Sequence, residues 1–94
     1  MNEEEFEWDE RKAESNFAKH GVTFESAQGV FSDPFAIEFA DDGNEYDEVR
    51  FRVIGMSAGV LLFVAYAMRG EAIRIISARG AEPYERRLYY EGQY

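Results

Sequence analysis

The sequence predicts an α+β domain: an antiparallel four-stranded meander, to which a short N-terminal strand could be added, packed with two N-terminal helices and one C-terminal helix. Before residue 33 the apolar residues recur at helical spacing, whereas after residue 35 they alternate or form short apolar runs divided by turns. With 94 residues, 46% of them apolar, the chain can build one core. We therefore expect a single domain over residues 1–94, with residues 1–5 flexible.

Two helices are expected near the N-terminus. Residues 6–9 alternate apolar and charged, as in a short strand, and Asp9 can then cap a helix over residues 10–20. Ala13 and Phe17, four residues apart, would lie on its buried side.

Gly21 suits the left-handed conformation that often ends a helix. Thr23 can cap a second helix, which ends before Pro34 because the residue preceding a proline avoids the α conformation.

The rest of the chain predicts strands and a closing helix. The strands are expected at residues 35–39, 49–56, 60–68 and 72–78, separated by a turn and acidic loop over 41–48, a turn at 57–59 and a hairpin at 69–71. The segment 60–68 is apolar on both faces, which predicts the central strand. Pro83 fits the first turn of a helix that continues to about residue 91.

Charge is distributed unevenly along the chain, whose net charge is −9. Residues 1–48 hold 15 acidic and 3 basic side chains, whereas residues 49–94 hold 4 acidic side chains and 7 basic ones, all arginine. Arginine binds phosphate through two parallel hydrogen bonds, so a local arginine patch suggests a small anionic target. The alternative is that these arginines pair with the surplus carboxylates.

The composition also excludes several classes of site. Without cysteine and with one histidine, the chain offers neither a disulfide, nor a thiolate zinc site, nor a multi-histidine site, so we expect no metal or other cofactor. Its N-terminus is acidic and its longest apolar run, residues 60–68, is far too short to span a bilayer. We expect a cytoplasmic protein with no membrane contact.

Four arginines of the strands are the strongest candidates for an anion site. Side chains alternate along a strand, so Arg50 and Arg52 share a face. Arg74 interrupts an apolar run, and a charge there must be paired or face a groove. Arg79 follows at the end of the same strand, and all four could line one site. The alternative is a set of pairs with the carboxylates Glu38, Glu71 and Glu85.

Helix 10–20 carries further candidates. His20 could act as general acid or base, or could serve only as a cation at the helix C-terminus. Lys12, Asn16 and Lys19 form a polar stripe that could contact phosphates or could simply be solvated.

The C-terminal segment combines tyrosines with arginines. These side chains could stack unpaired bases, or the tyrosines could pack inward. The set consists of Tyr84, Tyr89, Tyr90 and Tyr94 with Arg86 and Arg87.

Several stretches resemble the BrnT family. Its opening signature is matched by Phe6-Glu7-Trp8-Asp9-Glu10-x-Lys12 and by Asn16-x-x-Lys19-His20-Gly21-Val22-x-Phe24, and its middle by Phe31-x-Asp33-Pro34, Arg50 and Gly55-Met56-Ser57. Its closing signature is matched by Arg74-Ile75-Ile76-Ser77-Ala78-Arg79, Glu85-Arg86 and Tyr89. The resemblance runs from about residue 6 to about residue 91.

This resemblance implies a RelE-like fold and the toxin of a type II toxin–antitoxin system. The toxin would be a metal-independent ribonuclease that blocks translation. A BrnA-like antitoxin would neutralise it, and the complex would contact DNA only through that antitoxin. The resemblance also implies a catalytic set of His20, Arg50, Arg74 and Arg79, with Lys12, Lys19, Arg69 and Tyr89 as RNA-binding candidates.

Charge leaves a second function open. A pI near 4.5 is unfavourable for approach to a polyanion. The alternative is a weakly active or inactive family member that binds the antitoxin and regulates the operon.

Overall fold

The structure of the chain is a computed structural model, which describes residues 5–41 and 49–92. The expectations for residues 1–4 and for the acidic loop over 42–48 lie outside the described residues. Within the described ranges the elements are β1 (Glu5–Glu7), α1 (Glu10–His20), α2 (Phe24–Ala27), the 3-10 helix η1 (Gln28–Ser32), β2 (Ile37–Asp41), β3 (Arg50–Ser57), β4 (Val60–Arg69), β5 (Ala72–Gly80) and α3 (Pro83–Glu91).

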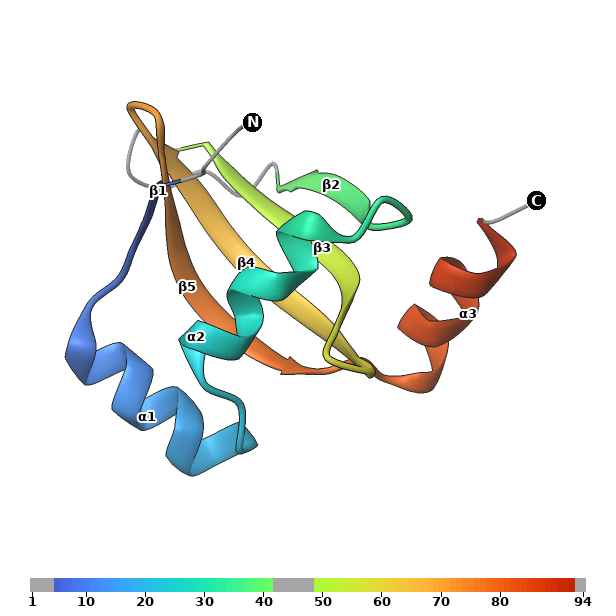
Figure 1. The fold of residues 1–94 in the computed structure, drawn as a ribbon, viewed down its shortest axis with the longest axis horizontal. Coiled ribbons are helices and arrows are strands. Elements are labelled where there is room, and N and C mark those ends of the chain that lie inside the picture. The colour runs from blue at the N-terminus through green and yellow to red at the C-terminus, as the bar shows by residue number, and fades with distance from the viewer. Residues whose placement is uncertain (1–4, 42–48, 93–94) are drawn as a thin grey trace.

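The strands form one sheet in the order β1-β5-β4-β3-β2 (Figure 1). Strands β2 to β5 make the expected antiparallel meander. The possible N-terminal strand is also present as β1, but it pairs in parallel with β5, so the sheet is five-stranded and mixed and not wholly antiparallel as expected. Strand β5 is an edge of the meander, and its unpaired N–H and C=O groups accept the short N-terminal strand.

The N-terminal helix begins and ends at the expected residues. The Asp9 carboxylate accepts hydrogen bonds from the backbone N–H groups of Arg11 (2.8 Å) and Lys12, and these bonds hold its pKa below the usual value. Gly21, at φ 71°, ends the helix and donates its N–H to the Phe17 carbonyl. The first N–H groups and the last C=O groups of a helix lack intrahelical partners. Here Asp9 and Gly21 provide partners for some of them.

The second helix is shorter than the spacing of apolar residues predicts. Thr23 caps it as expected, accepting a hydrogen bond from the Ser26 N–H, but the α-helical part ends at Ala27 and continues as η1. η1 passes very close to β3: a Cβ added at Gly55 would lie 2.9 Å from the Val30 Cβ. Glycine is required there because only a missing side chain allows this approach.

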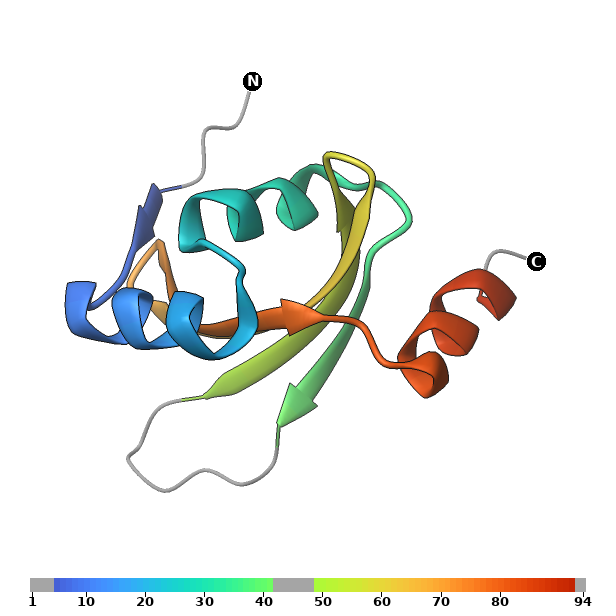
Figure 2. The same cartoon turned by 90° about the horizontal axis from the view of Figure 1, so that it is seen from below.

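The main core lies between the sheet and the N-terminal helices, which cover one face of it (Figure 2). Its members come from alternate positions of the three central strands and from α2 and η1: Phe24, Ala27, Val30, Val53, Leu62, Val64, Tyr66, Ile73, Ile75 and Ala78. Burial of this apolar surface is the main stabilising contribution to the fold. A smaller cluster of Ile54, Leu61 and Tyr89 lies on the other face, where α3 packs.

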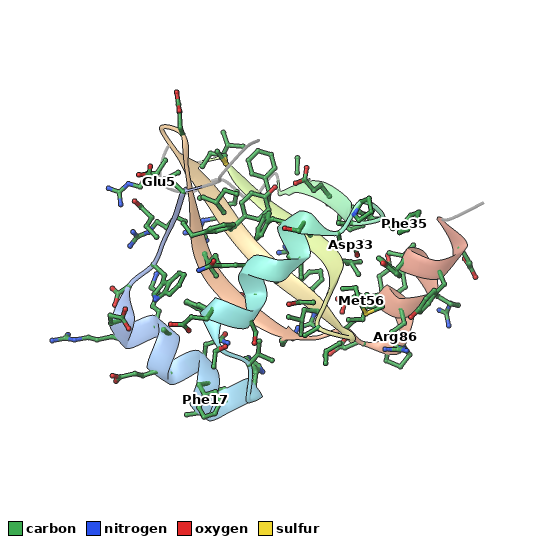
Figure 3. All side chains as sticks on the ribbon, in the orientation of Figure 1. Glu5, Phe17, Asp33, Phe35, Met56 and Arg86 are labelled. Carbon is green, nitrogen blue, oxygen red and sulfur yellow. The ribbon has the colours of Figure 1, made fainter. Side chains whose placement is uncertain are left out.

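Helix α1 packs on the sheet through a different residue from the one expected. The prediction that Phe17 is buried is wrong: its side chain is 54% exposed and points away from the sheet (Figure 3). Asn16 is buried instead. Its side-chain amide donates to the Ala78 carbonyl (2.7 Å) and accepts from the Ala78 N–H (3.0 Å). Asn16 thus replaces a strand partner along the part of β5 that β1 does not reach.

Within the described residues, no helix is both long and apolar enough to cross a membrane.

Candidate functional site

Strand register places five arginines on the sheet face opposite the main core. Arg50 and Arg74 are both partners of Ala67 on the central strand, which puts the three side chains in one row. Arg79 is the strand partner of Phe63 on β4, and Phe63 lies on the same side of β4 as Ala67. We call this surface the arginine face; its members are Arg50, Arg52, Arg69, Arg74 and Arg79.

A β-bulge makes this arrangement of β5 possible. Arg74 and Arg79 are five residues apart, so simple alternation would send them to opposite faces. Ala65 pairs with Ser77 while Tyr66 pairs with Ile75, which leaves Ile76 as an extra residue. The bulge restores both arginines to one face.

Glu7 on β1 neutralises part of one end of the arginine face. Its carboxylate lies 3.3 Å from Arg74 and 3.7 Å from Arg69, measured to one guanidinium nitrogen each. The Arg69 side chain is 57% exposed, that of Glu7 40% and that of Arg74 27%. Single contacts of this kind to an exposed carboxylate contribute little to stability and are readily exchanged.

The other end of the arginine face holds a tighter pair. Two nitrogens of Arg79 donate to the two oxygens of Glu85 at 2.9 and 2.8 Å, and the Arg79 guanidinium lies 4.4 Å from the centre of the Phe63 ring. The hydrogen bond to Glu85 raises the pKa of Arg79 despite its partial burial. Burial raises the pKa of Glu85, but the bonds from Arg79 and from the Glu82 N–H outweigh it and leave that pKa lowered. Both groups therefore stay charged.

The pair also fixes the start of α3. Glu85 accepts the backbone N–H of Glu82 at 2.8 Å, which closes a capping box at the helix N-terminus. The Glu85 side chain is only 9% exposed. Its bidentate bond to Arg79 thus connects the start of α3 to the end of β5.

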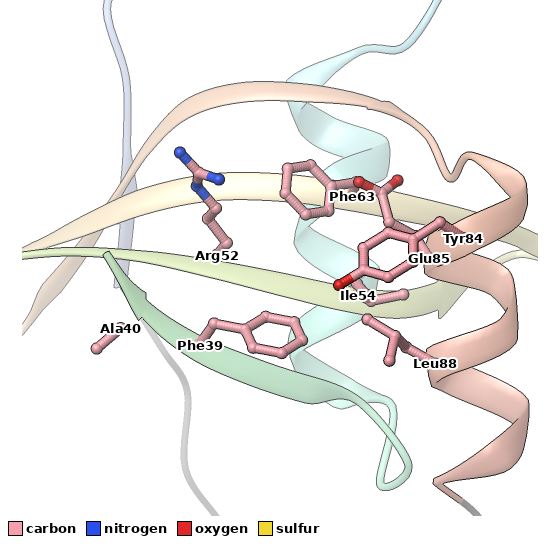
Figure 4. Close-up of a pocket in the computed structure, with 8 residues that line it drawn as sticks. All are labelled: Phe39, Ala40, Arg52, Ile54, Phe63, Tyr84, Glu85 and Leu88. Carbon is pink, nitrogen blue, oxygen red and sulfur yellow. The ribbon is translucent and has the colours of Figure 1, made fainter. Parts of the chain in front are cut away.

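A cavity of about 290 Å³ opens on the arginine face between β2, β3 and α3 (Figure 4). Arg52, Ile54 and Phe63 form its sheet side. The Arg52 guanidinium lies 5.9 Å from the centre of the Phe63 ring, so Phe63 contacts two arginines. The lining combines apolar and aromatic side chains with one cation, Arg52, and one carboxylate, Glu85.

A second hollow lies at the edge of the sheet, beside α1. This cleft, about 190 Å³, is lined by Lys12, Lys19 and His20 from the helix, with Ser15, Asn16, Ile76 and Ser77. Ser77 is the strand partner of Ala65 and so faces the same side as the arginines. No arginine is among the residues that line the cleft. The structure therefore brings the two lysines and His20 together, next to the arginine face but not on it.

Comparison with protein-family models identifies the family of this chain. A model of the family described as "Ribonuclease toxin, BrnT, of type II toxin-antitoxin system" matches residues 8–85. The chain belongs to the BrnT family. No curated relative was found by sequence comparison. Membership of a type II toxin–antitoxin family implies an antitoxin partner.

Tyr89 holds the fold of this BrnT chain together. Its side chain is 5% exposed, and its hydroxyl donates to Asp33 at 2.7 Å. Burial and this bond raise the pKa of Tyr89 to about 12. The expectation that Tyr89 presents a ring to RNA does not fit this setting, because a buried ring cannot stack on a base. Tyr89 lies on the apolar face of α3, so its ring packs inward and its hydroxyl finds a partner in Asp33 instead of facing solvent.

Asp33 is the other half of that contact and connects three parts of the chain. Besides Tyr89, it accepts the backbone N–H groups of Phe35 (2.9 Å) and Met56 (2.8 Å). Burial raises the pKa of Asp33, but these three hydrogen bonds leave it below the usual value. Asp33 therefore joins the entry to β2, the end of β3 and α3.

One residue of the site was not among the candidates chosen from the sequence. Arg52 was expected on the face of Arg50 as one of four strand arginines lining an anion site, although the catalytic set implied by the family resemblance did not include it. Phe63 belongs to a run that is apolar on both faces, so nothing in the sequence marks it as the ring between two arginines. Of the expected carboxylate partners, Glu85 binds Arg79, whereas Glu38 accepts the Tyr66 hydroxyl at 2.7 Å.

Proposed function

We propose that this chain is an active BrnT endoribonuclease of RelE-like type that cleaves RNA in the cytoplasm and thereby inhibits translation. A BrnA-like antitoxin would neutralise it and carry any DNA contact of the complex. One observation carries the proposal: a chain with net charge −9 gathers five arginines on one face of its sheet. Such a cluster can bind individual phosphate groups by direct contact, even though the net negative charge of the chain gives no long-range attraction to a polyanion.

The proposed reaction is attack of an RNA 2′-hydroxyl on the adjacent phosphate, which releases the 5′-oxygen of the next nucleotide. It requires a base for the hydroxyl proton, an acid for the leaving oxygen, and cations for the charge that develops on phosphorus. Arginine stays protonated, so Arg50, Arg74 and the outer edge of Arg79 would stabilise that charge. His20 is the proposed proton carrier because imidazole can both accept and donate a proton near neutral pH.

The remaining candidates have supporting roles in this proposal. Lys12 and Lys19 share the edge cleft with His20 and would hold a phosphate next to the one attacked. Arg69, exposed at the β4–β5 hairpin, would contact the RNA backbone farther along. Tyr89 would act only through the position of α3, since its ring is buried.

Cleavage of RNA by the purified protein tests the proposal. We expect wild type to cleave single-stranded RNA. Arg50→Ala/Arg74→Ala should lose activity at least a hundredfold, because two cations leave the transition state. The matched control is Arg86→Ala/Arg87→Ala, which removes two exposed arginines from α3 and should retain activity. Failure of wild type to cleave, or equal losses in both double variants, would contradict the proposal.

One observation favours a second candidate, a weakly active module that binds the antitoxin and regulates its operon. Glu7 contacts Arg69 and Arg74, and Glu85 contacts Arg79, so the arginine face is partly neutralised by the chain itself. Induced expression with and without the antitoxin gene separates the two candidates. Degraded cellular RNA only without the antitoxin supports the nuclease, and intact RNA in both cultures supports the module.

A further inference from the structure

Two aromatic side chains, Phe39 and Tyr84, line the 290 Å³ cavity on the arginine face. Phe39 comes from the edge strand β2 and Tyr84 from the first turn of α3, and their rings lie on opposite sides of the opening (Figure 4). The rest of the lining is apolar apart from one cation and one carboxylate: Ala40, Ile54, Phe63, Leu88, Arg52 and Glu85. The volume is at the lower end of the range for small-molecule pockets, about 300 Å³ upward, so it suits one small planar group.

Both rings expose large apolar area to solvent. Phe39 is 37% exposed and Tyr84 63%. Among the described residues, the ring pairs and cation–ring contacts involve other aromatic side chains, such as Phe63 and Tyr90, and neither of these two. Their faces are therefore available to a ligand, and an aromatic face is what a nucleobase stacks on.

The cavity also lies beside the proposed phosphate-binding groups. Phe39 is the strand partner of Arg52, and Arg52 follows Arg50 on the same face. On single-stranded RNA each base extends sideways from its own phosphate. A backbone bound along the arginines therefore directs a neighbouring base toward Phe39 and Tyr84.

We propose that this cavity is a base pocket, in which an unpaired base of single-stranded RNA stacks between Phe39 and Tyr84. The inference rests on the proposed function and defines its substrate class. Duplex RNA is excluded from such a pocket because its bases are paired and stacked on one another. Stacking adds affinity that is independent of phosphate charge.

Binding of an uncleavable oligonucleotide tests the pocket. The probe is a fluorescent single-stranded RNA of mixed sequence with every 2′-hydroxyl methylated, which blocks the attacking group but keeps bases and phosphates. We expect Tyr84→Ala and Phe39→Ala each to weaken binding about tenfold, because one stacked base contributes that much or more. The loss should be the same at low and high salt, since no charge is removed.

Two matched variants define the interpretation. Tyr84→Phe keeps the ring and should bind like wild type. Tyr90→Ala removes an exposed tyrosine of the same helix, 47% exposed, from outside the cavity and should also bind like wild type. An abasic probe of equal length should bind wild type and Tyr84→Ala equally.

The outcomes separate the pocket from the proposed function. If wild type binds and cleaves RNA but Tyr84→Ala and Phe39→Ala bind the probe like wild type, the base pocket is overturned and the nuclease stands. Equal losses in Tyr84→Ala and Tyr90→Ala overturn it as well. If wild type binds neither the methylated nor the abasic probe, both the pocket and the proposed function are overturned.

Discussion

The two ends of strand β5 hold arginines in different settings. Arg74, near the start of β5, makes one contact of 3.3 Å to Glu7, whose side chain is 40% exposed. Arg79, near its end, forms two short hydrogen bonds to Glu85, whose side chain is 9% exposed. Ala78, next to Arg79, is joined to Asn16 by two further bonds. Polar residues at the end of β5 hold the fold, whereas those at its start leave a cation within reach of a ligand.

This difference divides the polar residues of the family signature into two groups. Asn16, Asp33 and Glu85 have their hydrogen bonds satisfied inside the molecule, so their removal should cost stability. Arg74 and the lysines of the edge cleft lie at the surface, and their removal should affect ligand binding instead.

Asn16→Ala should give the largest loss of stability. It leaves the Ala78 N–H and C=O and the Val22 C=O without their side-chain partner, two of them buried. Unsatisfied buried groups cost about 1–3 kcal/mol each, so we expect the free energy of unfolding to fall by roughly 3 kcal/mol. Urea unfolding measures it, and the exposed neighbour Ser15→Ala should change it by less than about 0.5 kcal/mol. Similar values for both variants would show that Asn16 does not seal the edge of β5.

Arg79→Ala should follow, with a loss of about 2 kcal/mol, because Glu85 keeps its charge but loses its bidentate partner. Adding Glu85→Gln to this variant should recover part of the loss, since the uncompensated charge is removed. Urea unfolding of the two single variants and the double variant gives the coupling energy. A coupling near zero would place Arg79 with Arg74, as an arginine free to serve the site alone.

Acid should weaken the same end of the molecule. The pKa of Glu85 is lower in the folded protein than its ordinary value, so its contribution to stability is complete above that ordinary value and is lost as pH falls through the folded one. Thermal unfolding between pH 6 and pH 3 should therefore show a smaller drop in Glu85→Gln than in wild type. Parallel curves for the two proteins would contradict the assigned pair.

Arg74→Ala should have the smallest effect on stability, below about 0.5 kcal/mol, because its ion pair is single and partly exposed. The same urea titration measures it beside Arg79→Ala. A loss as large as that of Arg79→Ala would remove the contrast between the two ends of β5.

Local signals in the sequence predicted much of the fold. Asp9, Gly21 and Thr23 cap their helices as expected because capping depends on residues within one turn. The hairpins and the meander follow from alternation and turn residues. The parallel pairing of β1 was not predicted, since it joins residues more than sixty positions apart.

The site was less predictable because it depends on register. The arginines were correctly expected to interrupt apolar strands, but alternation alone would have separated Arg74 from Arg79, and the bulge at Ile76 has no mark in the sequence. Helical spacing suggested that Phe17 lies on the buried side of α1. Asn16 is buried instead, because its side chain can form hydrogen bonds with the backbone groups at the edge of β5. The catalytic assignment of His20 remains a proposal.

The salt dependence of RNA binding tests the central claim, that the arginine face holds RNA phosphates, most directly. Affinity falls as salt rises, and each phosphate contact to a single strand steepens the plot of log affinity against log salt concentration by about 0.7. With the methylated probe, Arg50→Ala/Arg74→Ala should therefore make the plot shallower by about 1.4 relative to wild type, whereas Arg86→Ala/Arg87→Ala should leave its steepness unchanged. An unchanged slope in the first variant, or an equal decrease in both, would contradict the account.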